Sequence, residues 1–229
     1  MSPISPDRFQ INKVVEQQSE EYLFTRNFLE MFQGKTFADI YWLLYLTNYN
    51  IAINLTVTNS QSRINYWRWL KNECGNHFDL SQVNIQLEGG ESTRILNNTF
   101  ALEISLQLDV AHNVTYANIS TNTPQSHNTL CSVFTNQLAG KSLSQVDWVL
   151  NMSRQGVVIT ILVSDSKQKE QIQSVLGQHS SSYNINRILF SEATDTPTRP
   201  MFSDEPFELS LKLNTEYIVD EAKIYPNYF

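Results

Sequence analysis

Glycine is scarce in this sequence, and the patterns that glycine would have to form for nucleotide binding are missing. The chain of 229 residues holds 7 glycines, and none of them lies in a GxGxxG or GxxxxGK[ST] arrangement. Both patterns need glycine because the backbone must approach a phosphate closely. The sequence therefore predicts neither a dinucleotide fingerprint nor a P-loop, and we expect no cofactor.

Cysteine and long apolar runs are also scarce. Cys74 and Cys131 are the two cysteines, too few for the disulfide framework of a small secreted domain, so we expect a reducing compartment. No apolar run approaches the ~18 residues of a membrane span, and residues 1–18 lack the basic and apolar parts of a secretory leader. We therefore expect neither a membrane span nor secretion by the usual signal.

Charge is low and weighted toward acid. Charged residues are 17% of the chain, with 16 basic against 23 acidic residues and a formal net charge of −7. Soluble domains typically carry about 25% charged residues. The basic residues are scattered singly, which argues against nucleic acid as the main partner. A polar, weakly charged surface favours close contact between protein surfaces.

The residue types that usually catalyse reactions or bind metals are isolated from one another. None of the 4 histidines lies at a spacing that would bring two imidazoles to one metal. His127 and Cys131 are four residues apart, but their surroundings are typical of a loop that runs into a strand rather than of a nucleophile and its base. Glu88 and Glu91 flank two glycines, a pattern that indicates a turn. We expect no catalytic site, no metal site and no enzyme activity.

Helices and strands are predicted from the spacing of apolar residues. Residues 7–32 have helical spacing without proline or glycine, and Gly34 follows as a stop signal. Asn59 or Ser60 caps a predicted helix over residues 61–74, and Asp165 caps a second one. Strand patterns recur at residues 38–46, 50–58, 83–87, 100–110, 113–120, 146–152, 157–163, 183–190 and 207–213.

The order strand, cap, helix, strand occurs twice, over residues 50–87 and 157–190, as a weak internal similarity. Strict alternation over residues 100–110 predicts a half-buried strand of an antiparallel sheet with one wet face. The predicted fold class is α+β, mainly an antiparallel β-sandwich decorated with three or four helices. The predicted organisation is an N-terminal helical arm (1–34), a single β-sandwich domain (35–219) and a C-terminal tail (220–229).

Three segments resemble the polyhedrins and granulins, the matrix proteins of insect-virus occlusion bodies. Residues 51–88 (IAINLTVTNSQSRINYWRWLKNECGNHFDLSQVNIQLE) and residues 148–193 are similar to that family's two strand–helix–strand parts, and residues 207–229 to its last strand and aromatic tail. Residues 89–109 are similar to the cytoplasmic-polyhedrosis branch. The basic nuclear-import cluster of the baculovirus branch is not present, so the resemblance leaves nucleus or cytoplasm open.

The resemblance implies a β-sandwich subunit that forms trimers and packs into an intracellular crystal around virions, stable near neutral pH and dissolving in alkali. The partners would then be copies of the same chain and virions. An aromatic tail would expose apolar surface unless a neighbour covered it, and one tryptophan faces away from the expected core. The candidate assembly residues are therefore Trp69, Tyr225, Tyr228 and Phe229.

Two other functions stay open. The main alternative is a non-catalytic binding or regulatory module of a bacterium or virus, and the second is a small-molecule enzyme without a recognised motif. Isolated subunits at high concentration would exclude the matrix hypothesis, and crystals inside expressing cells would support it. A role for Cys74 or Cys131 in bridging subunits also stays open.

Overall fold

The computed structural model describes residues 20–73, 77–90, 100, 102–121, 129–178, 181–192 and 204–227. A helix through residues 20–30 comes first. The chain then runs twice through the same order of elements. The first repeat (residues 36–121) consists of α2 (Phe37–Ile40), η1 (Tyr41–Tyr49), β1 (Ile51–Val57), α3 (Ser60–Glu73), η2 (Leu80–Gln82), β2 (Val83–Leu87), β3 (Leu102–Leu108) and β4 (Val114–Thr121).

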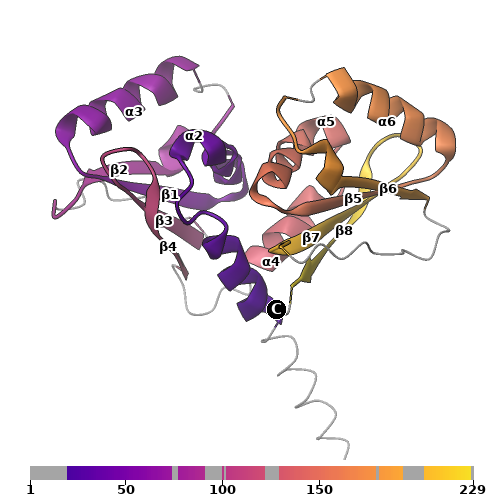
Figure 1. The fold of residues 1–229 in the computed structure, drawn as a ribbon, viewed down its shortest axis with the longest axis horizontal. Helices are drawn as coiled ribbons and strands as arrows, with labels where there is room; N and C mark the ends of the chain where they lie inside the picture. Colours follow the sequence, from indigo (N-terminus) through magenta and orange to yellow (C-terminus); the bar gives the residue numbers. More distant parts are fainter. Residues whose placement is uncertain are drawn as a thin grey trace, which may run out of the picture.

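The second repeat (residues 142–226) follows a short connection made of α4 (Leu130–Ser132) and η3 (Val133–Gln137). Figure 1 shows the repeats as two lobes side by side, with α3 and α6 on the same side of the molecule. The elements of the second repeat are α5 (Leu143–Val146), η4 (Asp147–Gln155), β5 (Val158–Val163), α6 (Ser166–Gln178), η5 (Ile185–Arg187), β6 (Ile188–Glu192), β7 (Phe207–Leu213) and β8 (Val219–Pro226).

Each repeat forms one four-stranded mixed sheet, with the orders β2-β1-β3-β4 and β6-β5-β7-β8. In both sheets the two middle strands are parallel to each other, and the last strand is antiparallel to its neighbour. Both last pairs shift register at the same point, after Gln107 and after Lys212. The α+β class therefore stands, but the sheets are mixed and the predicted antiparallel sandwich is wrong. Alternation shows that one face of a strand is covered, and it says nothing of strand direction.

The helix that joins the first two strands of each repeat begins at the predicted cap. The Asn59 side chain accepts a hydrogen bond from the Ser62 N–H at 2.8 Å, and the Asp165 side chain accepts one from the Gln168 N–H at 2.8 Å. A helical crossover of this length makes parallel pairing possible, because parallel strands cannot be joined by a tight turn. The predicted strand–helix–strand order, and its repetition, are confirmed.

Two predicted strands are helices instead. Residues 38–46 lie in α2 and η1, and residues 146–152 lie in α5 and η4, at equivalent places in the two repeats. Apolar residues on nearly every side of a short buried helix resemble a buried strand, so periodicity could not distinguish the two. The overlooked signal was capping: Thr36 with Asp39, and Ser142 with Gln145, form capping pairs at 2.6 and 3.0 Å.

The two repeats meet along η1 and η4. Trp42 and Trp148 occupy equivalent positions and stack on each other with ring centroids 6.2 Å apart and planes 17° apart. The Trp42 indole N–H donates to Gln155 Oε1 at 3.1 Å, and the Trp148 indole hydrogen-bonds to the Tyr49 side chain in the reciprocal position. We call this contact between equivalent residues the seam.

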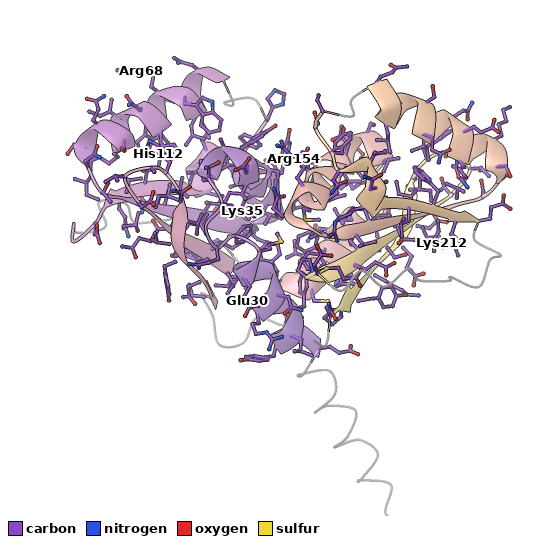
Figure 2. All side chains as sticks on the ribbon, in the orientation of Figure 1. Glu30, Lys35, Arg68, His112, Arg154 and Lys212 are labelled. Carbon is purple, nitrogen blue, oxygen red and sulfur yellow. The ribbon has the colours of Figure 1, made fainter. Side chains whose placement is uncertain are left out.

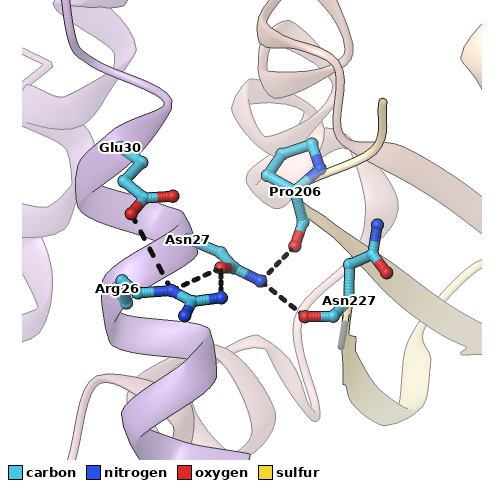
Figure 3. Close-up of polar contacts among 5 residues, drawn as sticks. All are labelled: Arg26, Asn27, Glu30, Pro206 and Asn227. Atoms are coloured by element: carbon cyan, nitrogen blue, oxygen red, sulfur yellow. Dashed lines mark hydrogen bonds and ion pairs between the residues drawn. The ribbon is translucent and has the colours of Figure 1, made fainter. Parts of the chain in front are cut away.

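The N-terminal helix closes the seam from below in the view of Figure 1. Phe24 and Phe28 are fully buried and pack edge-on or tilted against the rings of Phe134 and Phe207. Figure 3 shows the Asn27 side chain donating to the carbonyl oxygens of Pro206 at 2.8 Å and Asn227 at 2.9 Å. The described half of the expected arm is thus part of the protein's own core.

The segment expected to be a C-terminal tail is a strand over most of its length. Residues 219–226 form β8, which pairs with β7 from Pro226 opposite Phe207 to Val219 opposite Leu213. One face of the strand is covered: Val219, Ala222 and Pro226 are buried, while the residues between them are exposed or half-buried. A tail assignment over residues 220–226 is therefore wrong.

Candidate functional site

A groove opens in the first repeat between α3, the start of α2 and the β3–β4 turn. Its volume is about 440 Å³. The turn is shaped by Asp109, whose Oδ1 accepts hydrogen bonds from the N–H groups of Ala111 at 2.8 Å and Asn113 at 2.9 Å. We call it groove 1, and its lining residues are Thr36, Phe37, Ala38, Ser62, Asn65, Tyr66, Trp69, Ala111 and His112.

A larger groove opens at the equivalent place in the second repeat, between α6, the start of α5 and the β7–β8 turn. Its volume is about 690 Å³. Here Asn214 replaces the aspartate, and its Oδ1 accepts from the N–H groups of Glu216 at 2.9 Å and Ile218 at 3.0 Å. We call it groove 2, and its lining residues are Ser142, Leu143, Ser144, Asp147, Leu150, Gln171, Ile172, Ser174, Val175, Leu176, Tyr183, Glu216 and Tyr217.

The backbone that frames the two grooves is the same in detail. Isolated β-bridges join Thr36 to Asn113 and Ser142 to Ile218, and so tie each helix cap to its turn. His112 and Tyr217 occupy the same place in their turns with positive φ values of 68° and 63°. Left-handed backbone is uncommon for such residues, and here the side-chain hydrogen bonds of each turn stabilise it.

Groove 1 has an aromatic wall. Trp69 packs edge-on against Phe37 and Tyr41, with ring centroids 6.3 and 6.4 Å apart. Tyr66 packs edge-on against His112, which lies below α3 in the view of Figure 2. Burial raises the pKa of Tyr66 to about 12, so its hydroxyl stays protonated to a more alkaline pH than that of an exposed tyrosine. The groove offers apolar ring surface with few polar groups.

Groove 2 has an aliphatic floor and an acidic rim. Leu150, Ile172 and Leu176 are buried beneath it, and Val175 is 56% exposed at its side. Asp147 and Glu216 are its two charged lining residues, both acidic and both exposed. Burial, and then the charge of Asp147, raise the pKa of Tyr183. The groove therefore combines apolar surface with negative potential.

The predicted assembly residues lie in different parts of the structure. Trp69 belongs to the wall of groove 1 and is partly buried there. Tyr225 lies on the outer strand β8 and is 43% exposed. Tyr228 and Phe229 lie outside the described residues. The two candidates that the structure describes, Trp69 and Tyr225, thus lie in different repeats and do not form one site.

The residues considered for catalysis and metal binding do not form a site in the described ranges. Burial, followed by Glu21 and Glu20, raises the pKa of Cys131 to about 11, which leaves little thiolate near neutral pH. Glu88 lies in a turn and accepts a hydrogen bond from the Gln107 side chain at 2.9 Å, as the turn interpretation predicts. His127, Cys74 and Glu91 lie outside the described residues. Among the residues that the structure describes, no three His, Cys, Asp or Glu side chains are grouped to hold a metal ion, and no helix is long and apolar enough to cross a membrane.

Sequence reasoning missed both grooves, although the sequence carried a signal for them. Each groove begins after a Gly-Lys-Thr or Gly-Lys-Ser triplet, at residues 34–36 and 140–142. Both glycines have positive φ, and their N–H groups donate to the carbonyls of Val114 and Val219 on the last strand of each sheet. An alignment of the two triplets would have extended the recognised repeat to the caps and turns.

Comparisons with family models, with curated proteins and with solved structures found no match for the chain.

Proposed function

We propose that this protein is a non-catalytic binding module that holds segments of other proteins in two equivalent grooves, one in each repeat. The observation that carries the proposal is that both repeats frame a groove in the same way: the helix cap, the β-bridge and the turn held by a side chain recur, while the residues that line the grooves differ. Concave, mostly apolar surfaces with a few polar groups are the usual binding sites of proteins. The volumes of about 440 and 690 Å³ suit a few side chains of a bound segment.

The test is a selection of dodecapeptides from a random library on the full-length protein, followed by isothermal titration of each selected peptide. Each peptide is then measured against Trp69→Ala (groove 1) and Val175→Ala (groove 2). We expect each peptide to lose affinity about tenfold or more in one of these variants, because a central contact is worth more than ~1.4 kcal/mol. Trp67→Ala on the same helix and Val110→Ala, 76% exposed outside both grooves, serve as controls. Peptides that bind with unchanged affinity to both groove variants would refute the proposal.

A second candidate function is the self-assembling matrix of a viral occlusion body, with copies of the chain and enclosed virions as partners. Tyr225 favours it, because an aromatic side chain that is 43% exposed on an outer strand suits contact with another copy. A subunit with two binding grooves could also join two neighbours and extend a lattice. In this proposal the chain is non-catalytic and accumulates within the infected cell, in the nucleus or the cytoplasm.

Sedimentation velocity over a wide concentration range, with electron microscopy of expressing cells, tests this second function. We expect particles that grow with concentration in the parent protein and are reduced in Tyr225→Ala. Asp220→Asn is the control, since Asp220 is an exposed residue of the same outer strand and carries no aromatic surface. Deleting residues 225–229 is unsuitable, because it removes the end of β8 where Pro226 pairs with Phe207. A monomer at every concentration would exclude the matrix function.

A further inference from the structure

The two grooves share a frame but differ in charge. Position by position, Asp147 of groove 2 corresponds to Tyr41 of the first repeat, since each begins the 3-10 helix of its repeat. Glu216 corresponds to Ala111, since each precedes the residue with positive φ in its turn. Both exchanges place a carboxylate only in the second repeat. Neither groove is lined by lysine or arginine among the described residues.

The two carboxylates of groove 2 come from two elements that are far apart in the chain and both line the groove. Asp147 stands at the start of η4, and Glu216 is held in the β7–β8 turn by its backbone N–H bond to Asn214. The hydroxyl of Tyr217 donates to Gln171 Oε1 and so joins the turn to α6 beside the floor. A segment lying in the groove would place apolar side chains on the floor and pass both acids at the rim.

An apolar floor with two carboxylates at the rim favours some classes of ligand over others. Phosphate groups of nucleic acid and of anionic lipids would be repelled by two acidic rim residues. Lysine and arginine fit, because their methylene stems can cover apolar surface while the charged end reaches a carboxylate. The rim acids are exposed, so each ion pair contributes modestly to affinity and more to the choice of ligand.

We propose, resting on the binding function proposed above, that groove 2 binds a protein segment with lysine or arginine beside apolar residues. Groove 1, with its aromatic wall and no acidic lining residue, has no such charge preference. Groove 2 is therefore selective for basic segments and groove 1 is not, so groove 1 serves as an internal reference for groove 2.

The experiment uses full-length protein and three labelled peptides that share one leucine-rich pattern and carry lysine, glutamine or glutamate at the polar positions. Affinities are measured by fluorescence anisotropy at low and at physiological salt, with binding assigned to groove 2 by the loss in Val175→Ala. We expect the lysine peptide to bind about tenfold more tightly than the glutamate peptide, and salt to narrow the difference. The double variant Asp147→Asn/Glu216→Gln should bind all three about equally.

The outcomes separate this inference from the function on which it rests. If the three peptides bind groove 2 with equal affinity, the charge preference is wrong while the binding function stands. If none of them, and no selected peptide, binds either groove, the binding function itself fails. The substitutions are isosteric and lie at exposed positions, and unchanged thermal unfolding of the double variant confirms that lost selectivity is not lost structure. A lysine preference that persists in the double variant would also overturn the inference.

Discussion

The two repeats of this protein are alike where the backbone needs a particular residue and different where a side chain faces a groove. Thr47 and Ser153 show the first kind: each hydroxyl donates to the carbonyl three residues back and accepts an N–H from the residue before the short helix that leads into β2 or β6. Tyr66 and Ile172, on the groove side of α3 and α6, show the second kind. The backbone frame is therefore the constant part of the duplication, and the groove lining is the variable part.

The seam offers the strongest way to test whether the repeats depend on each other. Trp148 is 3% exposed and packs against Trp42, Tyr45, Tyr49 and Phe134. We expect Trp148→Ala to lower the free energy of unfolding by about 3–5 kcal/mol, since it leaves a large cavity. Urea unfolding followed by circular dichroism measures it. Arg154→Ala, on the same 3-10 helix but exposed, should change stability little, and a similar loss in both would contradict a specific role of the seam.

The reciprocal hydrogen bonds of the seam can be broken one at a time. Gln155→Ala removes the acceptor of the buried Trp42 indole N–H and the donor to the Asp39 carbonyl, which lies 3.1 Å from Gln155 Nε2. We expect a loss of about 1–3 kcal/mol, because buried polar groups then lack partners. Tyr49→Phe removes the hydroxyl that partners the Trp148 indole. It should lower the free energy of unfolding by less than Gln155→Ala, since only the Trp148 indole N–H loses a partner. Equal stability of Gln155→Ala and the parent in urea would show that water replaces these bonds.

The caps of α2 and α5, which lie where each groove begins, should contribute about equally to the stability of the protein. Thr36→Ala removes a side chain that donates to Asp39 Oδ2 at 2.6 Å, and Ser142→Ala changes the equivalent cap of α5. We expect each change to cost about 0.5–2 kcal/mol in thermal unfolding. Lys35→Ala and Lys141→Ala, at the exposed positions just before the two caps, are the controls and should cost less. A large difference in the loss of stability between Thr36→Ala and Ser142→Ala would contradict the equivalence of the two caps.

The smallest expected effect is a change in stability at alkaline pH, which involves Tyr66 of the first repeat. The folded pKa of Tyr66 is raised to about 12 by burial, while an unfolded tyrosine titrates near ~10. The stability that comes from keeping Tyr66 protonated is thus complete below about pH 10 and is lost as the pH rises toward 12. Tyr66→Phe should therefore match the parent at pH 8 and gain on it between pH 10 and 12 in urea unfolding. Tyr116→Phe, with an exposed ring, is the control, and parallel pH profiles of parent and Tyr66→Phe would contradict the prediction.

Elements with a cap and a long apolar stripe were predictable from sequence. The strand at residues 51–57, the helix at residues 60–73 and the inward set of Phe207, Leu209 and Leu211 lie within a residue or so of where the patterns placed them in the described part of the chain. The short helices at residues 38–46 and 146–152 were not, because most of their apolar residues are buried and a short apolar run has no distinctive period. The aromatic end of the chain was misinterpreted as a tail, because an outer strand also leaves side chains such as Tyr225 exposed.

The low charge follows from composition alone, and the caps of α3 and α6, the buried faces of the strands and the repeated strand–helix–strand order follow from residues close together in the chain. Only the tertiary structure decided that β1 and β3 run parallel, that Trp42 meets Trp148, and that a helix cap, a distant turn and α6 enclose a groove with Asp147 and Glu216 at its rim. These contacts join residues far apart in the chain, and their geometry follows from how the whole apolar core packs, which no local pattern records.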